Sequence, residues 1–369
     1  MTAGNGGTPG DAAPPPLDRR AVSQALEGVI DDSALGGLIR VTTPDGVWGA
    51  RAGHADADRT QPVDPRGFFR IGSITKTITA TVVLQLVAER RIGLDAPLQQ
   101  HVAGLLPAHY PPITVRQLLQ HTSGVPNYLP RVTVDADRLI RDRYRRHTPE
   151  ELLTAALARP PAFEPGTRLG YSNTNYVLLG LLVRAVTGRR WDEEVTRRIT
   201  GPLGMTGTFH PGGNPALPTP HAHGYTRTTD GRLIDITQIN ASVWDAAGSM
   251  VATAADLDTY LAALLSGRLV PAPLLDEMLT PHPQRLPEVP WFGFGLGVQH
   301  LAAPGWDGPA GIHGGGGSLR GYTSMAFATR DGGRRVVLCL NVTTADEMRP
   351  VEKALAVARA VFGRNRPRP

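Results

Sequence analysis

A serine and a lysine three residues apart are the side chains in this sequence best suited to covalent chemistry. Ser73 and Lys76 lie in the stretch Gly72-Ser73-Ile74-Thr75-Lys76, where we predict that a helix begins. A spacing of three puts both side chains on one face of that helix. A neutral lysine amine can then remove the proton of the serine hydroxyl. The pattern predicts a nucleophilic Ser73 that carries a covalent acyl intermediate.

The scarcity of lysine singles out Lys76. Of the 38 lysine and arginine residues, only Lys76 and Lys353 are lysine. Arginine cannot release its proton at accessible pH, whereas burial and neighbouring charge can convert lysine to a neutral amine. Lys353 lies in a predicted exposed helix, where an ordinary surface role suffices. We therefore expect Lys76 to be retained for catalysis.

Two further segments carry side chains that can take part in acyl transfer. Tyr171-Ser172-Asn173 offers a phenol that can act as general acid or base, and an amide that can bridge a lysine and a substrate carbonyl. By itself this string also suits a loop tyrosine followed by a helix cap. The glycine-rich stretch from His313 to Tyr322 can bring backbone amides close to a ligand, or form a flexible hairpin. It is not a phosphate loop, because no Gly-Lys-Ser/Thr follows it.

The elements that must position these residues alternate between strands and helices. We predict helices over 17–30, 73–91, 175–187 and 350–362, hairpins over 38–51 and 323–342, and a strand over 292–301. Strands near both ends of the chain suggest one sheet built from both termini. The predicted α/β lobe covers about 17–94 and 246–365, with a helical lobe inserted at about 95–245. Residues 1–16 are expected to form a disordered tail.

Composition excludes several classes of protein. Apolar residues make up 41% of the chain, which suits a globular protein, and no run approaches the length of a membrane span. Cys339 is the only cysteine and lies in an apolar run, so we expect it to be buried in the core. The net charge of +5 is scattered apart from the cluster 141–146, which we interpret as a solvated helix face. We therefore expect no nucleic-acid partner.

The sequence implies no metal or organic cofactor. The 11 histidines show no zinc-type spacing, and His221-Ala222-His223 lies in a proline-rich stretch that we expect to be a surface loop. The first 16 residues lack the charged start and apolar stretch of a secretory signal. We therefore favour a cytoplasmic protein, with secretion as the alternative if a leader has been removed. The oligomeric state stays open.

In combination, the motifs resemble the serine β-lactamase / penicillin-binding superfamily over roughly residues 20–362. The likeness is greatest to peptidase family S12, which includes D-alanyl-D-alanine carboxypeptidases and class C β-lactamases. It rests on ordered matches: Phe69-Arg70-Ile71-Gly72-Ser73-Ile74-Thr75-Lys76, Leu118-Leu119-Gln120-His121-Thr122-Ser123-Gly124, Tyr171-Ser172-Asn173-Thr174-Asn175-Tyr176, Pro202-Leu203-Gly204-Met205, Thr253-Ala254-Ala255-Asp256-Leu257 and Phe294-Gly295-Leu296-Gly297. The resemblance implies a β-lactamase-like fold, with an antiparallel sheet flanked by helices, an all-helical inserted lobe, and the active site in the cleft between them.

The resemblance also implies roles for individual residues. Ser73 matches the nucleophile and Lys76 the amine that assists it. Tyr171 matches the acid/base that carries the proton to the leaving group, and Asn173 the residue that holds Lys76 and the substrate amide. His313 takes the first place of the third family motif, Lys/His-Thr/Ser-Gly. The oxyanion hole is expected to use the N–H of Ser73 and one amide of the strand after His313.

Two departures from the family pattern concern the substrate. The segment from His313 to Tyr322 has Gly314 where a hydroxyl residue is common, and it is about two residues longer than usual. We expect its backbone, including Gly315, to bind substrate. Counting forward from His313 gives Gly316 as the second oxyanion donor, and counting back from Tyr322 gives Ser318, so both stay open.

The second departure lies where the carboxypeptidases have an arginine for the substrate carboxylate. This chain has Gln299 there, and Arg320 is a candidate substitute from the longer segment. Losing a charge-assisted partner costs a bound carboxylate about 2–3 kcal/mol. The chemistry of the family therefore transfers more directly than its substrate does.

Three functions remain as hypotheses. The first is a serine hydrolase or acyltransferase that acts on an ester, amide or thioester of a small peptide-like molecule, as in specialised metabolite (antibiotic) biosynthesis. The second is a D-alanyl-D-alanine carboxypeptidase or transpeptidase of peptidoglycan peptides. The third is a penicillin-binding receptor that is acylated without turnover. An α/β-hydrolase is excluded because no Gly-x-Ser-x-Gly string exists in the chain.

Overall fold

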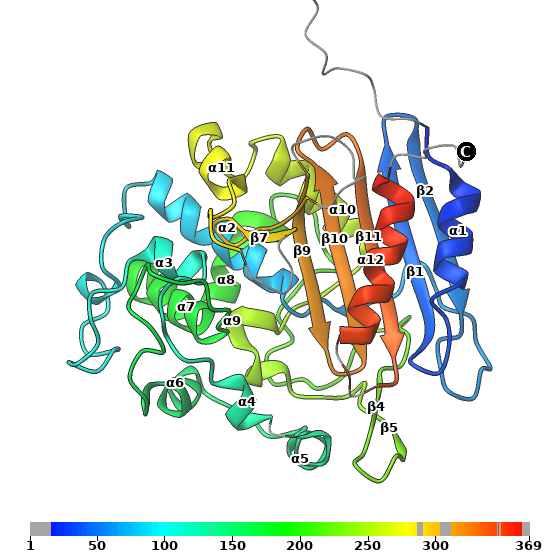
Figure 1. Ribbon diagram of the computed structural model, residues 1–369, viewed down its shortest axis with the longest axis horizontal. Helices are drawn as coiled ribbons and strands as arrows, with labels where there is room; N and C mark the ends of the chain where they lie inside the picture. The colour runs from blue at the N-terminus through cyan, green and yellow to red at the C-terminus, as the bar shows by residue number, and fades with distance from the viewer. Residues whose placement is uncertain are drawn as a thin grey trace, which may run out of the picture.

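The computed structural model describes residues 16–133, 135–285, 291–302, 311–344, 346 and 348–363. These residues form a seven-stranded antiparallel sheet with the strand order β2-β1-β11-β10-β9-β8-β7. Helices α1 and α12 cover one face, and α10 and α2 pack on the other (Figure 1). A lobe rich in helices lies beyond α2. The predicted fold class, a sheet built from both ends of the chain and flanked by helices, is therefore confirmed.

The helices and strands have the following bounds. The strands are β1 (Ala34–Thr43), β2 (Gly46–Gly53), β3 (Phe69–Arg70), β4 (Tyr225–Arg227), β5 (Leu233–Asp235), β6 (Val251–Ala252), β7 (Phe292–Phe294), β8 (Gln299–Leu301), β9 (Ile312–Leu319), β10 (Tyr322–Thr329) and β11 (Arg335–Val342). The α-helices are α1 (Arg19–Glu27), α2 (Ile74–Ala88), α3 (Val115–Leu119), α4 (Leu129–Val132), α5 (Ala136–Asp142), α6 (Pro149–Leu157), α7 (Thr174–Thr187), α8 (Trp191–Val195), α9 (Asp245–Gly248), α10 (Ala254–Leu265), α11 (Ala272–Leu279) and α12 (Met348–Phe362). Short helical turns cover Leu98–Gln100, Thr196–Thr200 and Ala241–Val243.

Local sequence signals explain where several helices begin and end. The side chain of Asp18 accepts a hydrogen bond from the N–H of Ala21 and caps α1. Helix α7 ends at Gly188, whose φ of +75° is a left-handed conformation that glycine adopts without strain. Helix α2 has nearly all its residues buried, because it lies between the sheet and the helical lobe. It therefore has a fixed position relative to both.

Three expectations about the elements need correction. The lobe at 95–245 is not all-helical, because it contains the β4–β5 hairpin. The strand expected over 292–301 is two strands, β7 and β8, which turn at Gly297 with φ of +80°. The glycine-rich segment does belong to a hairpin, since β9 turns at residues 320 and 321 into β10, but it is a regular strand paired with both β8 and β10 rather than a flexible segment. The expected tail lies outside the described residues except for Pro16.

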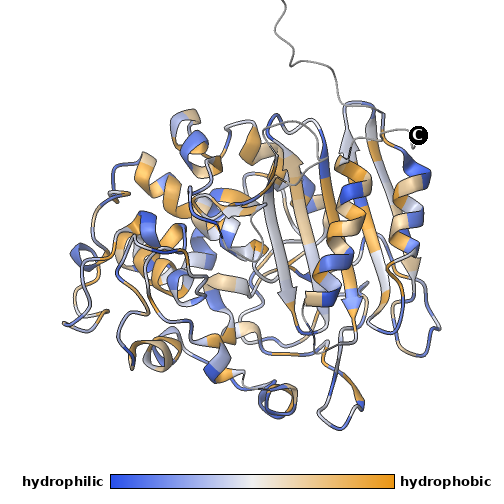
Figure 2. Ribbon diagram, viewed as in Figure 1, coloured by the Kyte–Doolittle hydropathy of each residue, from blue (hydrophilic) through white to orange (hydrophobic). Residues whose placement is uncertain are grey.

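Hydropathy along the chain matches these layers. In Figure 2 the central strands β10 and β11 are mainly hydrophobic, whereas β9 is pale because it is largely glycine. Cys339 on β11 is 5% exposed, which confirms that the lone thiol is a core residue. No helix among the described residues has the length and apolar character that a membrane crossing requires.

Lys353 is not the exposed surface residue that we expected. Its side chain is 16% exposed, and it ties α12 to the segment that precedes β1. Nζ donates hydrogen bonds to the Val29 carbonyl at 3.0 Å and the Ser33 hydroxyl at 2.8 Å, and it forms an ion pair with Asp31. Both lysines of the chain therefore have specific contacts, but those of Lys353 are structural.

Replacing Lys353 with methionine should lower the free energy of unfolding by about 1–3 kcal/mol at neutral pH. Burial alone raises the pKa of Asp31, but hydrogen bonds from Lys353 and Ser33 outweigh it and hold that pKa below its usual value. A depressed folded-state pKa stabilises the protein above about pH 4, and this contribution is lost as the pH falls further. Urea unfolding at pH 7 and pH 3 should show a smaller effect of the mutation at pH 3. Equal stability of both proteins at pH 7 would contradict the prediction.

Candidate active site

Ser73 lies at the start of α2, as predicted. It is the N-cap residue of the helix, but its hydroxyl makes no capping hydrogen bond. The preceding Gly72 has φ of +50° and lies against β9. A Cβ on Gly72 would lie 3.2 Å from both Gly317 and the Ser318 nitrogen, so a side chain there would push the strand away. The hydroxyl of Ser73 is therefore not used to cap the helix, and it is held next to β9.

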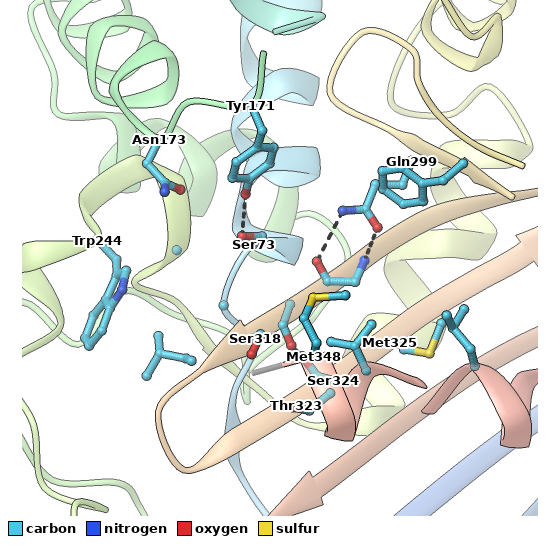
Figure 3. Close-up of a pocket in the computed structure, with 18 of the residues that line it drawn as sticks. Ser73, Tyr171, Asn173, Trp244, Gln299, Ser318, Thr323, Ser324, Met325 and Met348 are labelled. Carbon is cyan, nitrogen blue, oxygen red and sulfur yellow. Dashed lines mark hydrogen bonds between the residues drawn. The ribbon is translucent and has the colours of Figure 1, made fainter. Parts of the chain in front are cut away.

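Two polar side chains contact this hydroxyl. Ser73 Oγ lies 2.7 Å from the hydroxyl of Tyr171 and 3.1 Å from Lys76 Nζ. Figure 3 shows Tyr171 reaching down from the helical lobe to the start of α2. Lys76 Nζ also lies 4.9 Å from the centre of the Tyr171 ring. The structure thus brings together the three residues that the sequence and the resemblance assigned to nucleophilic attack and proton transfer.

Lys76 is in an environment that favours a neutral amine. It is 4% exposed, and desolvation by burial lowers its pKa well below the usual value. Lys76 Nζ donates hydrogen bonds to two carbonyl oxygens: Asn173 Oδ1 at 2.7 Å and the backbone carbonyl of Ala247 at 2.6 Å. A neutral amine has two hydrogens and one lone pair. If both hydrogens are given to these carbonyls, the lone pair is left for the hydroxyl of Ser73.

Hydrogen bonds from Asn173 to Asn127, a residue outside the predicted site, hold Asn173 in place. Asn127 Oδ1 accepts hydrogen bonds from the backbone N–H of Asn173 at 3.2 Å and from its Nδ2 at 3.3 Å. Because Nδ2 is used in this way, Oδ1 of Asn173 faces Lys76. Nothing in the spacing of Asn127 indicates this contact, because 46 residues separate the two asparagines.

The ring of His121 packs against the ring of Tyr171. Their rings lie 4.4 Å apart, and His121 Nδ1 accepts a hydrogen bond from the Ser172 N–H at 3.2 Å. Burial, with a further contribution from Lys76, lowers the pKa of His121 well below its usual value, so the ring is neutral. The residue has φ of +61°, an uncommon conformation for a side chain of this size. In the sequence, His121 lies within one of the matched family motifs, but the motif by itself indicates no role for it.

A cavity of about 460 Å³ opens in front of Ser73. One part, which we call the lobe arm, is lined by Leu129, Thr133, Leu139 and Trp244. The other part, the sheet arm, is lined by Phe292, Leu301, Met325, Phe327, Met348 and Leu355. Figure 3 shows Trp244 and Gln299 on opposite sides of Ser73. Within the described residues, no group of three His, Cys, Asp or Glu side chains is arranged to hold a metal ion.

The free edge of β9 passes in front of the start of α2. Gln299, at the start of β8, uses its side chain to extend the ladder: Gly316 donates its N–H to Gln299 Oε1 at 2.7 Å (Figure 3). Alternate residues of a strand direct their backbone groups to the same side. The N–H and C=O of Ser318 therefore also point away from β10, into the cavity beyond the end of β8.

The predicted substrate-binding residues are only partly brought together. Gln299, Gly316, Ser318 and Arg320 line the cavity, whereas Gly315 does not. A Cβ on Gly315 would contact Thr77 at 3.1 Å, because this position faces α2. It therefore offers its backbone to the packing of β9 on α2 rather than to a ligand.

The position of His313 does not support a catalytic role. Its ring packs on that of His300 at 4.9 Å, and it is not among the residues that line the cavity. The reason is the register of β9: the residue beside the Ser73 nitrogen is Gly317, four positions further along the strand. Gly317 lies between Gly316 and Ser318, the two candidate oxyanion donors, so the structure brings both ends of that choice next to Ser73 and leaves His313 away from it.

A fold with a sheet, a central helix and a helical lobe around a buried Ser-x-x-Lys pair defines the class of serine hydrolases with a β-lactamase fold. The family model described as Beta-lactamase matches residues 19–360 of this chain. The chain therefore belongs to the Beta-lactamase family.

Solved structures and curated relatives of the family include amidases and an esterase. A D-stereospecific amidohydrolase from Streptomyces sp. is 35% identical, with a TM-score of 0.83 over 94% of this chain and 98% of that one. The D-amino acid amidase from Ochrobactrum anthropi SV3 is 26% identical, with a TM-score of 0.80 over 92% and 97%. Esterase EstB from Burkholderia gladioli is 31% identical over 51% of this chain. The matched stretches span 30% to 52% of the length of the curated relatives.

Proposed function

We propose that this protein hydrolyses an amide or ester bond of a small amino-acid derivative through an acyl-enzyme on Ser73. The observation that carries the proposal is the contact of the Ser73 hydroxyl with both Tyr171 and a buried Lys76. Such a contact allows the proton to leave as the oxygen attacks. The amidase and esterase relatives support the choice of reaction.

The first step transfers the acyl group to Ser73. Ser73 Oγ attacks the substrate carbonyl carbon while its proton passes to Lys76 Nζ. The N–H groups of Ser73 and Ser318 form the oxyanion hole, since the Gly316 N–H is already donated to Gln299. A single oxyanion donor typically contributes about 10²–10³ to kcat. Of the two candidates that the sequence left open, we therefore propose Ser318.

The second step releases the leaving group. When the tetrahedral intermediate collapses, the bond from carbon to the leaving oxygen or nitrogen breaks and that atom takes the proton of the Tyr171 hydroxyl. Lys76 returns the proton taken from Ser73 to Tyr171, so the protons balance. Water then attacks the acyl-enzyme with the same groups in reversed roles.

The contacts of Gln299 disfavour a D-alanyl-D-alanine carboxypeptidase. Its side-chain amide faces the backbone of Gly316, accepting the N–H at 2.7 Å, with Nε2 3.5 Å from the carbonyl. A substrate carboxylate next to this uncharged, engaged side chain would lack a charge-assisted partner. An amide or ester without a terminal carboxylate avoids that cost. The relatives named for D-amino acid chemistry suggest amino-acid amides of D configuration as the first substrates to test.

Mixing the protein with D- and L-amino-acid amides and methyl esters should release ammonia or methanol and transiently add the mass of the acyl group to Ser73. Rapid acid quenching and peptide mass spectrometry detect the adduct, because the ester to serine survives acid. The Ser73→Ala variant is the control and should show no adduct. A peptide ending in D-Ala-D-Ala tests the alternative, and release of D-Ala at a higher rate than any amide or ester would overturn the proposal.

A further inference from the structure

The sheet arm of the cavity lies on the face of the sheet that α12 covers. Ile312 of β9 belongs to the apolar core between the sheet and α12. Because side chains alternate along a strand, positions 314, 316 and 318 face α12 as well. Two of them are glycine, so β9 presents bare backbone there. The groove runs over this backbone, with Met325 and Phe327 of β10 on one side and Leu301 of β8 on the other.

Gly316 is the floor of this groove. A Cβ at that position would have only Gln299 Oε1 at 3.2 Å and the Ser324 carbonyl at 3.9 Å within 4 Å, so the space above it is open. Gly314 differs, because a Cβ there would overlap the Ala326 backbone. Backbone packing thus explains Gly314, whereas the lack of a side chain at Gly316 leaves room for a ligand.

Aromatic rings connect the proton donor to this groove. The Tyr171 ring lies 5.8 Å from Phe294, and Phe294 lies 4.9 Å from Phe292, which lines the sheet arm. The leaving atom must lie within hydrogen-bond reach of the Tyr171 hydroxyl to receive its proton. A group attached to that atom can therefore extend past these rings toward Gln299, which lies on the opposite side of Ser73 from Trp244 (Figure 3).

We propose that the sheet arm binds the leaving group of the substrate, and that this group is an uncharged alkyl or aromatic amine or alcohol. The inference rests on the proposed function. The apolar character of this leaving group follows from the side chains of the sheet arm, which include Met348, a methionine that is 60% exposed at the start of α12. Glu352 of α12 also lines the cavity, but its side chain is exposed to solvent. A leaving group that covers this surface removes it and the groove walls from water.

Esters that share one acyl group and differ in the alcohol test the proposal. Methyl, butyl and hexyl alcohols have nearly the same acidity, so kcat/KM differences among them report binding in the transition state. Each fully buried methylene contributes about fourfold. With partial burial, kcat/KM should rise at least tenfold from the methyl to the hexyl ester.

The variant Leu355→Asp introduces a charge into the groove and should reduce the hexyl-to-methyl ratio of kcat/KM to below three. Ala356→Asp is the matched control, because the next residue of α12 is exposed, and it should keep the wild-type ratio. The ratio is measured within each protein, so partial misfolding cancels. Met348→Asp is a second variant, at an exposed position where an acidic residue suits the first turn of a helix. It should also lower the ratio.

The outcomes separate this inference from the proposed function. An unchanged ratio in both Leu355→Asp and Met348→Asp overturns it. The inference is also overturned if kcat/KM depends on the length of the acyl group and not on that of the alcohol, and Leu355→Asp removes this dependence. Turnover with a Ser73 adduct but no preference at all overturns the inference alone. If no ester is turned over and none forms an adduct on Ser73, the proposed function is overturned.

Discussion

Replacing Lys76 with arginine is expected to lower kcat/KM at least about a thousandfold, because the guanidinium stays protonated and cannot accept the proton of Ser73. In the native protein, burial lowers the pKa of Lys76, and two carbonyls accept hydrogen bonds from its amine. Arginine keeps the charge but removes the lone pair. The measurement is the rate of Ser73 acylation by an activated ester in a single turnover.

Lys353→Arg is the matched control, since it makes the same substitution at the only other lysine. Arginine can keep the charge near Asp31 and donate to the neighbouring oxygens, so acylation should stay within about twofold of wild type. If Lys76→Arg acylates at a comparable rate, the proposed role of Lys76 is wrong.

The pH dependence of kcat/KM provides an independent check on Lys76. Only the neutral amine can act as base, so activity rises as the pH passes the pKa of Lys76. Because burial lowers that pKa well below 10.5, the rise should be complete well below pH 10.5. The profile of Lys76→Arg should lack this limb. A wild-type profile that rises only near pH 10.5 would show that the amine is not desolvated during catalysis.

The reacting residues could be predicted because their chemistry constrains residue type. A Ser-x-x-Lys string is common, but retention of lysine in a chain with 36 arginines pointed to Lys76, and the structure places it 3.1 Å from Ser73 Oγ. The sheet and its flanking helices followed from hydrophobic periodicity. Residues such as Asn127 and His121 could not be assigned roles, because their contacts depend on how distant loops meet.

The glycine-rich segment shows where sequence reasoning fails. Glycine has low strand propensity, so a run of four suggested a flexible hairpin. The structure shows a strand whose glycines are required by close approach: to α2 at Gly317, and to β10 at Gly314. The same ambiguity left the second oxyanion donor open between Gly316 and Ser318, and the structure places His313, the first residue of the presumed family motif, outside the cavity. Tertiary contacts, rather than propensity, decide both points.

Replacing Gly317 with alanine is expected to lower kcat about 10²-fold or more. The new Cβ would overlap the Ile71 carbonyl and lie 2.9 Å from the Ser73 nitrogen. The strand and the start of α2 must then separate, and the two N–H groups that we propose as oxyanion donors, those of Ser73 and Ser318, would no longer converge on one oxygen atom. Loss of one such donor costs about 10²–10³ in kcat. Overpacking at a buried site also costs about 1–3 kcal/mol of stability.

Gly49→Ala on β2 separates the two effects, because it introduces the same methyl group in a strand far from the cavity. Its Cβ would lie 3.2 Å from the Ile39 carbonyl, a contact that a small shift relieves. Both variants are compared by urea unfolding and by the acylation rate per folded molecule. If Gly317→Ala loses stability but acylates Ser73 at the wild-type rate when folded, the close approach of β9 to α2 serves packing alone. A selective loss of acylation instead supports the conclusion that this glycine keeps the two oxyanion donors together.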